Sequence, residues 1–322
     1  MFKWKKRGLI WSPSLNNVWM KEYGQNPNAV VLEDRIRIYF SSRKKCDDKK
    51  YMSYIFFIDV DKYNPLKILA VHDKPVLNAN GKGDAGDFDE FGTMPGSLVW
   101  HADKQEMWMY YVGWSRSDQL PYKWANGLAI SKDGASFEKI TREPIISSRY
   151  EYPFLQACPR VFKQAENHWK MWYASGLEWY HEEDKVHPIY VLMSAHSEDG
   201  IHWELSGKQT IPSVGNKECQ SSASVIEFAE RYHMFFSYRD VTPIEEKHKQ
   251  YRVGYAWSND LINWHRDDAK AGIDVSESGW DSQAICYPHV VKVEDKIYMF
   301  YSGNQFGCAG FGFAELEPNT VN

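Results

Sequence analysis

Acidic residues stand a few positions ahead of several segments that read as β-strands. The candidates are Asp89, Glu90, Glu151, Glu218 and Asp281. Two carboxylic groups can cleave a glycosidic bond, because one protonates the leaving oxygen while the other activates water or attacks the sugar. Acids gathered in one pocket also adopt different protonation states, since like charges repel. We therefore expect a catalytic role among these five; the alternative for each is a turn cap at the rim of the pocket.

Arginines and one histidine form a second group of candidates. Arg43 and Arg239 occupy equivalent places in two copies of a repeat, and Arg160 and His289 each follow the proline column of that repeat by one position. Guanidinium groups clamp phosphate or carboxylate through paired hydrogen bonds. These four residues therefore predict a site for an anionic group, and ion pairs with neighbouring acids are the alternative.

Aromatic and amide side chains complete the predicted site. Trp114 and Trp280 fall in predicted loops, and Tyr287 stands directly ahead of a proline, so each could stack against a sugar ring. Asn26 and Asn28 flank the equivalent proline of the first repeat. We expect all five to contact the substrate, whereas most other aromatic residues fit strand packing.

The elements that must position these residues repeat five times along the chain. The core of each copy is an aromatic-rich strand that ends in small residues, as in Met299-Phe300-Tyr301-Ser302-Gly303. The third positions of the five copies, 62 to 71 residues apart, are Phe40, Tyr111, Tyr173, Phe236 and Tyr301.

Three further strands accompany each aromatic strand. One precedes it by a hairpin and carries a proline near its start, except in the fourth copy, where alanine stands. That column reads Pro27, Pro95, Pro159, Ala223 and Pro288. The next strand ends in a Ser-x-Asp-Gly turn or a close variant, and an aromatic residue then opens a fourth strand. These turns begin at Ser131, Ser197 and Ser258.

Five units of four antiparallel strands predict an all-β fold, a five-bladed β-propeller, as a single domain over residues 1–322. After Tyr301 the chain has room for one more strand, residues 310–316, and residues 4–10 resemble the missing outer strand. We expect the N- and C-terminal strands to close the last blade together, because closure removes open sheet edges. The innermost strands would line a central channel and bring the candidate residues to one mouth. A β-sandwich with chance similarity is the alternative.

Charge and composition exclude several classes of protein. The chain carries 38 basic and 43 acidic residues, a net charge of −5, without a basic stripe, so nucleic acid is not an expected partner. Five cysteines without a Cys-x-x-Cys pair predict neither a disulfide framework nor a zinc site, and we expect no metal or cofactor. The N-terminus lacks the apolar stretch of a signal peptide, and no run of about 18 apolar residues occurs, so we expect a cytoplasmic protein without a membrane span. The oligomeric state stays open.

Two motifs resemble those of a known superfamily. Tyr173-Ala174-Ser175-Gly176 is a strand-end Tyr-x-Ser-Gly, and Ser197 to Trp203 reads Ser-x-Asp-Gly-x-x-Trp. With the unit length and the five repeats, they are similar to the arabinanase, levansucrase and invertase superfamily, which includes glycoside hydrolase families 32, 43, 68 and 130. The resemblance spans essentially the whole chain. It implies a five-bladed propeller that acts on glycosidic bonds in a central funnel.

The chain departs from the family pattern at the catalytic positions. Families 32 and 43 have Asp ahead of the first-blade proline, where this sequence has Asn26, and an amide serves neither as base nor as nucleophile. Glu218-Cys219 resembles the Glu-Cys of family 32 but falls in the fourth repeat. Glu151-Tyr152-Pro153 resembles the Glu-x-Pro of family 43 but is out of register with Pro159.

The leading interpretation is a glycosidase-like, carbohydrate-active enzyme in which Glu218 or Asp281 is the general acid. Asp89 or Glu90 and Glu151 would polarise or position the sugar. Family 130 phosphorylases use one acid with a basic cluster for inorganic phosphate, so a phosphorylase, or a glycosyltransferase of surface-polysaccharide metabolism, is the second interpretation. A glycan-binding propeller without catalysis is the third, and a scaffold for protein partners is the fourth. The expected partner is a carbohydrate, with an anionic sugar or inorganic phosphate as open options.

Overall fold

The computed structural model describes residues 1–14, 16–46, 50–78, 83–117, 120–151, 153–182, 185–215, 217–241 and 250–318. These ranges form an all-β fold with one short α-helix, α1 (Asn304–Gly307), and one 3-10 turn (Asp268–Lys270). Neither is long or apolar enough to cross a bilayer. The strands are β1 Trp4–Trp11, β2 Glu22–Val31, β3 Arg35–Lys45, β4 Tyr51–Asp61, β5 Ile68–His72, β6 Gly92–His101, β7 Glu106–Ser115, β8 Lys123–Ser131, β9 Glu138–Lys139, β10 Gln156–Ala165, β11 His168–Glu182, β12 Lys185–Ser197, β13 Glu204–Gln209, β14 Glu218–Phe228, β15 Arg231–Asp240, β16 Arg252–Ser258, β17 His265–Arg266, β18 Cys286–Val293, β19 Lys296–Ser302 and β20 Phe311–Leu316.

The strands associate in antiparallel groups of four that follow one another along the chain. Three separate sheets have the orders β10-β11-β12-β13, β14-β15-β16-β17 and β1-β20-β19-β18. A larger sheet contains β2-β3-β4, with β5 beside β4, and continues into β6-β7-β8-β9. Its two halves are joined by a single parallel pair, Ser53 with Gly92, so each half is itself a four-stranded antiparallel unit. The predicted repeat of four short strands is thereby confirmed for the described parts of the chain.

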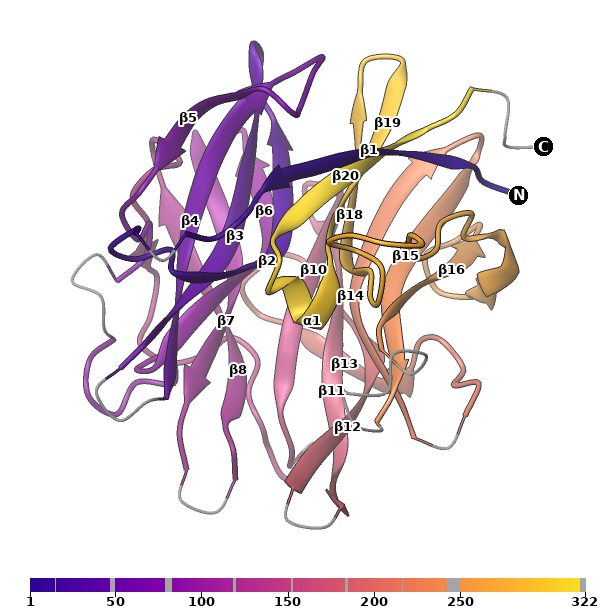
Figure 1. The fold of residues 1–322 in the computed structure, drawn as a ribbon. Coiled ribbons are helices and arrows are strands. Elements are labelled where there is room, and N and C mark those ends of the chain that lie inside the picture. The colour runs from indigo at the N-terminus through magenta and orange to yellow at the C-terminus, as the bar shows by residue number, and fades with distance from the viewer. Residues whose placement is uncertain are drawn as a thin grey trace.

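The two ends of the chain share one sheet. Strand β1 pairs antiparallel with β20, which places Trp4 opposite Leu316 and Trp11 opposite Phe311. Figure 1 shows the indigo N-terminal strand lying along the yellow C-terminal one. The expected outer strand of the last group therefore does come from the N-terminus, and it covers the edge that β20 would otherwise expose.

The first strand of each group lies at the centre of the molecule. Strands β2, β6, β10, β14 and β18 contact one another in that cyclic order, and β18 contacts β2 in turn. Their labels gather in the middle of Figure 1. Any residue carried near the start of these strands is therefore brought close to residues from the other four groups.

Each first strand is bulged at the proline column. The residue ahead of that column has a positive φ in four strands, at Asn26 (57°), Cys158 (52°), Ser222 (52°) and Tyr287 (55°). Such backbone costs about 1–3 kcal/mol for a residue other than glycine and persists only where the surroundings enforce it. The pairing register shifts at the same places, as between Ala157 and Arg160. The bulges divide each first strand into a part that faces the mouth of the channel and a part beyond it.

The Ser-x-Asp-Gly turns join neighbouring groups. Ser131 Oγ accepts the N–H of Gly134 at 2.9 Å, and the Asp133 carboxylate accepts the N–H of Ala135 at 2.7 Å. The Tyr39 hydroxyl, from the preceding group, donates to the Gly134 carbonyl at 2.5 Å. Tyr110 makes the equivalent bond to the Gly200 carbonyl at 2.9 Å. The motif is thus a structural link between sheets, which explains why it recurs with the repeat.

Candidate functional site

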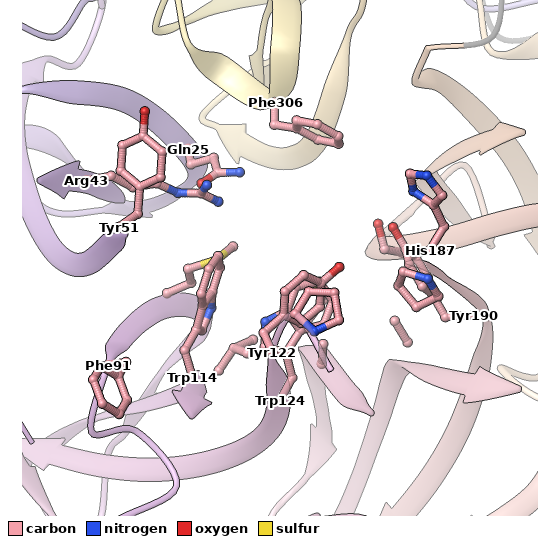
Figure 2. A pocket seen from close by; sticks show the side chains of 18 of the residues that line it. Gln25, Arg43, Tyr51, Phe91, Trp114, Tyr122, Trp124, His187, Tyr190 and Phe306 are labelled. Atoms are coloured by element: carbon pink, nitrogen blue, oxygen red, sulfur yellow. The ribbon is translucent and has the colours of Figure 1, made fainter. Parts of the chain in front are cut away.

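A cavity of about 480 Å³ lies on the axis of the ring of first strands. All five first strands reach it, through Gln25, Met94, Cys158, Ser221 and Tyr287. Each of these residues lies within two positions of the proline column, so the repeat itself sets the position of the cavity. Figure 2 shows the side chains that surround the opening.

Aromatic side chains form much of the wall. Trp114 ends β7, and Tyr122 and Trp124 stand where β8 begins; the rings of Tyr122 and Trp124 stack with centroids 4.4 Å apart and an angle of 15°. Phe306, from α1, faces them across the opening (Figure 2). The buried indole N–H groups of Trp114 and Trp124 have no hydrogen-bond partner among the described residues. Flat apolar walls with a few unused polar groups are typical of small-molecule sites.

Two arginines bring positive charge into this wall. The guanidinium carbon of Arg43 lies 4.5 Å from the ring centre of Tyr23 and 4.8 Å from that of Trp114. That of Arg239 lies 5.4 Å from the Tyr251 ring centre. The buried Nε–H groups of both arginines have no acceptor among the described residues. Burial lowers the pKa of Arg43, but an arginine remains protonated at neutral pH.

The cavity has a cationic and aromatic character. Among the lining residues that the structure describes, none is Asp or Glu, whereas Arg43, Arg239, Lys50 and Arg116 all contribute to the wall. A carboxylate does lie close behind the wall, because the Tyr51 hydroxyl donates a 2.6 Å hydrogen bond to Glu22 Oε2. Burial, followed by this bond, raises the pKa of Tyr51, so the phenol keeps its proton.

The predicted acids are not brought to the cavity. Asp89 is buried and accepts from Lys139 at 2.7 Å and from the Tyr111 hydroxyl at 3.1 Å. Asp281 is buried in the same way, between Lys6 at 2.7 Å and the Tyr301 hydroxyl at 3.0 Å. In both cases the tyrosine is the third position of the aromatic repeat.

Glu218 is also buried and ion-paired, but with different partners. It is buried and accepts from Arg266 at 2.6 Å and from the Gln220 amide at 2.7 Å. Lys139, Lys6 and Arg266 all stand on the outermost strand of their group, β9, β1 and β17. Each buried acid therefore connects the start of a first strand with the outer strand of the same group, and none of the three lines the cavity.

The other two predicted acids also lie outside the cavity. Glu90 is partly buried, and its carboxylate accepts the backbone N–H of Gly86 at 3.1 Å. Glu151 is exposed in the segment before β10.

The nine predicted binding residues fall into three places: four line the cavity, four lie beyond it on the first strands, and one packs elsewhere. Arg43, Trp114, Arg239 and Tyr287 line the cavity. The four others of the expected axial set lie beyond it on the first strands: Asn26, Asn28, Arg160 and His289.

Trp280 is the outlier among the predicted binding residues. Its ring stacks on Tyr301 at 5.1 Å, and its atoms lie against Gly303 and Gly312, so it packs within the last group instead of facing a ligand.

Arg160 forms hydrogen bonds with residues of two other first strands. It donates to Asn26 Oδ1 at 2.7 Å, to the Gly96 carbonyl at 2.7 Å and to Asn28 Oδ1. These bonds connect β10 with β2 and β6 across the axis. Burial lowers the pKa of Arg160 to about 10, so it is charged at neutral pH.

Sequence reasoning missed a set of tyrosines that line the cavity. Tyr51, Tyr122 and Tyr251 each open, or directly precede, the third strand of their group. Tyr251 and Tyr190 also share a hydrogen bond between their hydroxyl groups. The recurring tyrosine at the entry to the third strand was a readable signal, but the expectation concentrated on residues ahead of the first strands.

The fold is similar to that of solved glycoside hydrolases over nearly the whole chain. One similar solved structure is a glycoside hydrolase with a TM-score of 0.74 and 18% identity, covering 98% of this chain and 92% of that one. A thermostable family-43 glycoside hydrolase has a TM-score of 0.65 at 14% identity, covering 94% and 90%. A structure from the GH130 family of mannoside phosphorylases has a TM-score of 0.69 at 15% identity, covering 99% and 95%. At these identities the likeness concerns the fold alone.

Closer sequence relatives define the family. Two Mycobacterium tuberculosis proteins of uncharacterized function, Rv1502 (strain ATCC 25618 / H37Rv) and MT1551 (strain CDC 1551 / Oshkosh), are each 34% identical over 316 residues, which covers 98% of this chain and 99% of each relative. The chain belongs to their family.

A shorter sequence match is also present. The sucrose-6-phosphate hydrolase of Bacillus subtilis is 31% identical over 81 residues, 25% of this chain and 15% of that protein. No protein-family model matches the chain.

Proposed function

We propose that this protein is a single-domain, five-bladed β-propeller enzyme that binds an anionic glycoside in its axial cavity and cleaves or transfers its glycosidic bond. Five antiparallel groups of four strands, with their first strands in a contact ring, support the blade count. The superfamily fold supports a carbohydrate as the substrate.

One observation carries the preference for an anionic substrate. Arg43 and Arg239 present buried, unused Nε–H groups at a wall where no described residue is acidic. A buried donor without a partner costs about 1–3 kcal/mol, so a ligand that supplies acceptors gains that energy back. A carboxylate or phosphate group satisfies guanidinium groups best, because the hydrogen bonds are then charge-assisted.

The rest of the wall fits the sugar itself. Trp114 and the stacked pair of Tyr122 and Trp124 offer flat faces, and the two indole N–H groups, which have no partner in the described part of the chain, can donate to ring hydroxyls. We assign substrate binding to Arg43, Trp114, Arg239 and Tyr287, and a structural role to the ion-paired acids.

Phosphate-dependent cleavage is the second candidate, and the same cationic wall favours it. Inorganic phosphate, as hydrogenphosphate bound by the two arginines, would attack the anomeric carbon, the glycosidic C–O bond would break, and the leaving oxygen would take the proton of the hydrogenphosphate. In this reading the anion is a co-substrate, and the sugar itself can be neutral.

A matched ligand series tests the proposal. Calorimetry would compare a neutral oligosaccharide with the same oligosaccharide carrying one uronic acid or one phosphate group, each with and without inorganic phosphate. Preference for the charged form supports the leading proposal, whereas binding of the neutral form only with phosphate supports the second. Chromatography of the products in phosphate and phosphate-free buffer then separates hydrolysis, phosphorolysis and binding without turnover. Equal affinity for neutral and charged forms, regardless of phosphate, contradicts both candidates.

A further inference from the structure

A second, smaller cavity lies beyond the bulges of the first strands. Its volume is about 50 Å³, and its polar lining consists of Ser97, Arg160, Ser224 and His289 from β6, β10, β14 and β18. These positions follow the proline column, whereas the first-strand residues that line the large cavity precede it. The two cavities share no lining residue.

The charge of Arg160 is not balanced by a carboxylate among the described residues. The side chain is 3% exposed, and its acceptors are the amide oxygens of Asn26 and Asn28 and the carbonyl of Gly96. Its Nε–H has no acceptor in the described part of the chain. Neutral oxygens solvate a guanidinium but leave its net charge in place, and burying an uncompensated charge is costly.

Ser224 and His289 offer hydrogen-bond donors to this cavity, whereas the Ser97 hydroxyl donates to the Val161 carbonyl at 3.4 Å. Ser224 Oγ accepts the N–H of Val290 at 2.8 Å, which leaves its hydroxyl hydrogen to donate. His289 Nδ1 accepts the N–H of Ala29 at 2.9 Å, so the ring proton resides on Nε2. Burial and the nearby Arg160 charge lower the pKa of His289 to about 3, which keeps the ring neutral and this tautomer in place.

A donor-lined cavity with one positive charge suits a small anion. We propose that this cavity binds a chloride-sized inorganic anion, which neutralises Arg160 and stabilises the ring of first strands. A single water needs roughly 10–15 Å³ of such space, so the cavity holds a halide with one or two waters but no sugar. The site is separate from the proposed substrate cavity and does not depend on it.

Chloride-dependent stability tests the proposal in solution. The unfolding temperature of the full chain would be measured in sodium chloride and in sodium methanesulfonate at equal ionic strength. We expect a higher unfolding temperature in chloride, by about 2 °C or more, because a ligand that binds only the folded state stabilises it. Equal unfolding temperatures in the two salts overturn the proposal.

Variants test whether the chloride response comes from this cavity. Ser224→Ala and His289→Phe each remove one donor and should at least halve the chloride response; Arg160→Met should abolish it. If Arg160→Met does not fold, the two donor variants decide. Arg7→Met is the control, because it removes an exposed arginine that lines neither cavity, and it should keep the full response. A response that persists in all three cavity variants, or disappears in the control, overturns the assignment.

Bromide gives a direct view of the position. A crystal soaked in sodium bromide should show an anomalous peak within contact distance of Arg160 and His289. A peak in the large cavity alone contradicts the proposal. A peak at Arg160 without any chloride response in solution means binding at crystal concentration only, and this also counts against it.

Discussion

Buried acids and cavity arginines have opposite environments in this protein. Asp89, Glu218 and Asp281 each accept from a cation and from a second donor of the chain. Arg43 and Arg239 instead lie against aromatic rings, and their Nε–H groups have no acceptor among the residues that the structure describes. Charged groups that the chain satisfies belong to the architecture, while those it leaves unsatisfied beside a cavity indicate a ligand.

The bracing acids also explain a feature of the repeat. The pair Asp89 and Lys139 spans 50 residues, and the pair Glu218 and Arg266 spans 48. In the last group the same brace joins Asp281 to Lys6, 275 residues apart. This long-range pair helps to fasten the N-terminal strand into the sheet that the two ends share.

Removal of both cavity arginines is the strongest test of the difference between the ion-paired acids and the cavity arginines. Each lost charge-assisted hydrogen bond costs about 2 kcal/mol, so Arg43→Met with Arg239→Met should weaken binding of an anionic oligosaccharide roughly a thousandfold. Calorimetry measures the affinity. Arg7→Met, which removes a partly exposed pair with Glu315, is the control and should bind normally. Unchanged affinity in the double variant would falsify the assignment of the anion site.

Removal of the buried acids tests their proposed structural role. Glu218→Gln removes one of the two carboxylates that pair with the buried Arg266, while Asp268 remains, so we expect a loss of about 2 kcal/mol in the free energy of unfolding. Asp281→Asn should cost less, since Lys6 is partly exposed. Ligand affinity and turnover per folded molecule should stay within about twofold. A hundredfold loss of turnover with normal stability would instead restore these acids as catalysts.

The pH dependence of stability isolates His289. Its pKa of about 3 in the folded state lies below the ordinary value near 6.5, so the unfolded chain takes up this proton first as the pH falls. Stability is therefore intact above about pH 6.5 and declines toward pH 3, by up to about 1.4 kcal/mol per pH unit from this group. His289→Asn should reduce that slope by about one proton between pH 6 and pH 4, measured by urea unfolding. An unchanged slope contradicts the neutral, buried state of the ring.

Trp114→Phe should give the smallest effect. The ring face remains while the unused indole N–H is lost, so we expect about fivefold weaker binding of the oligosaccharide. Trp280→Phe is the matched control, because that ring packs on Tyr301 away from the cavity, and it should change stability but not affinity. Equal effects of the two substitutions on affinity would contradict the assigned boundary of the site.

Much of the architecture could be predicted from local patterns. The aromatic strands, the proline column and the Ser-x-Asp-Gly turns recur at fixed places, and short-range hydrogen bonds such as Ser131 to Gly134 depend only on neighbours in sequence. Arg43, Arg239, Trp114 and Tyr287 follow the same register, which is why the sequence could indicate residues that line the cavity. The ion pairs of the acids could not be predicted, because position along a strand says nothing about which distant cation a carboxylate meets.

The amino-acid sequence by itself determined the all-β class, the four-strand unit and the junction of the two ends, since alternation, turn chemistry and repetition act over short stretches of chain. Tertiary structure alone decided which charged side chains form ion pairs within the fold and which face the cavity. That distinction depends on partners 48 to 275 residues away, as for Glu218 with Arg266 and Asp281 with Lys6, and such distances are set only when the sheets pack around one axis.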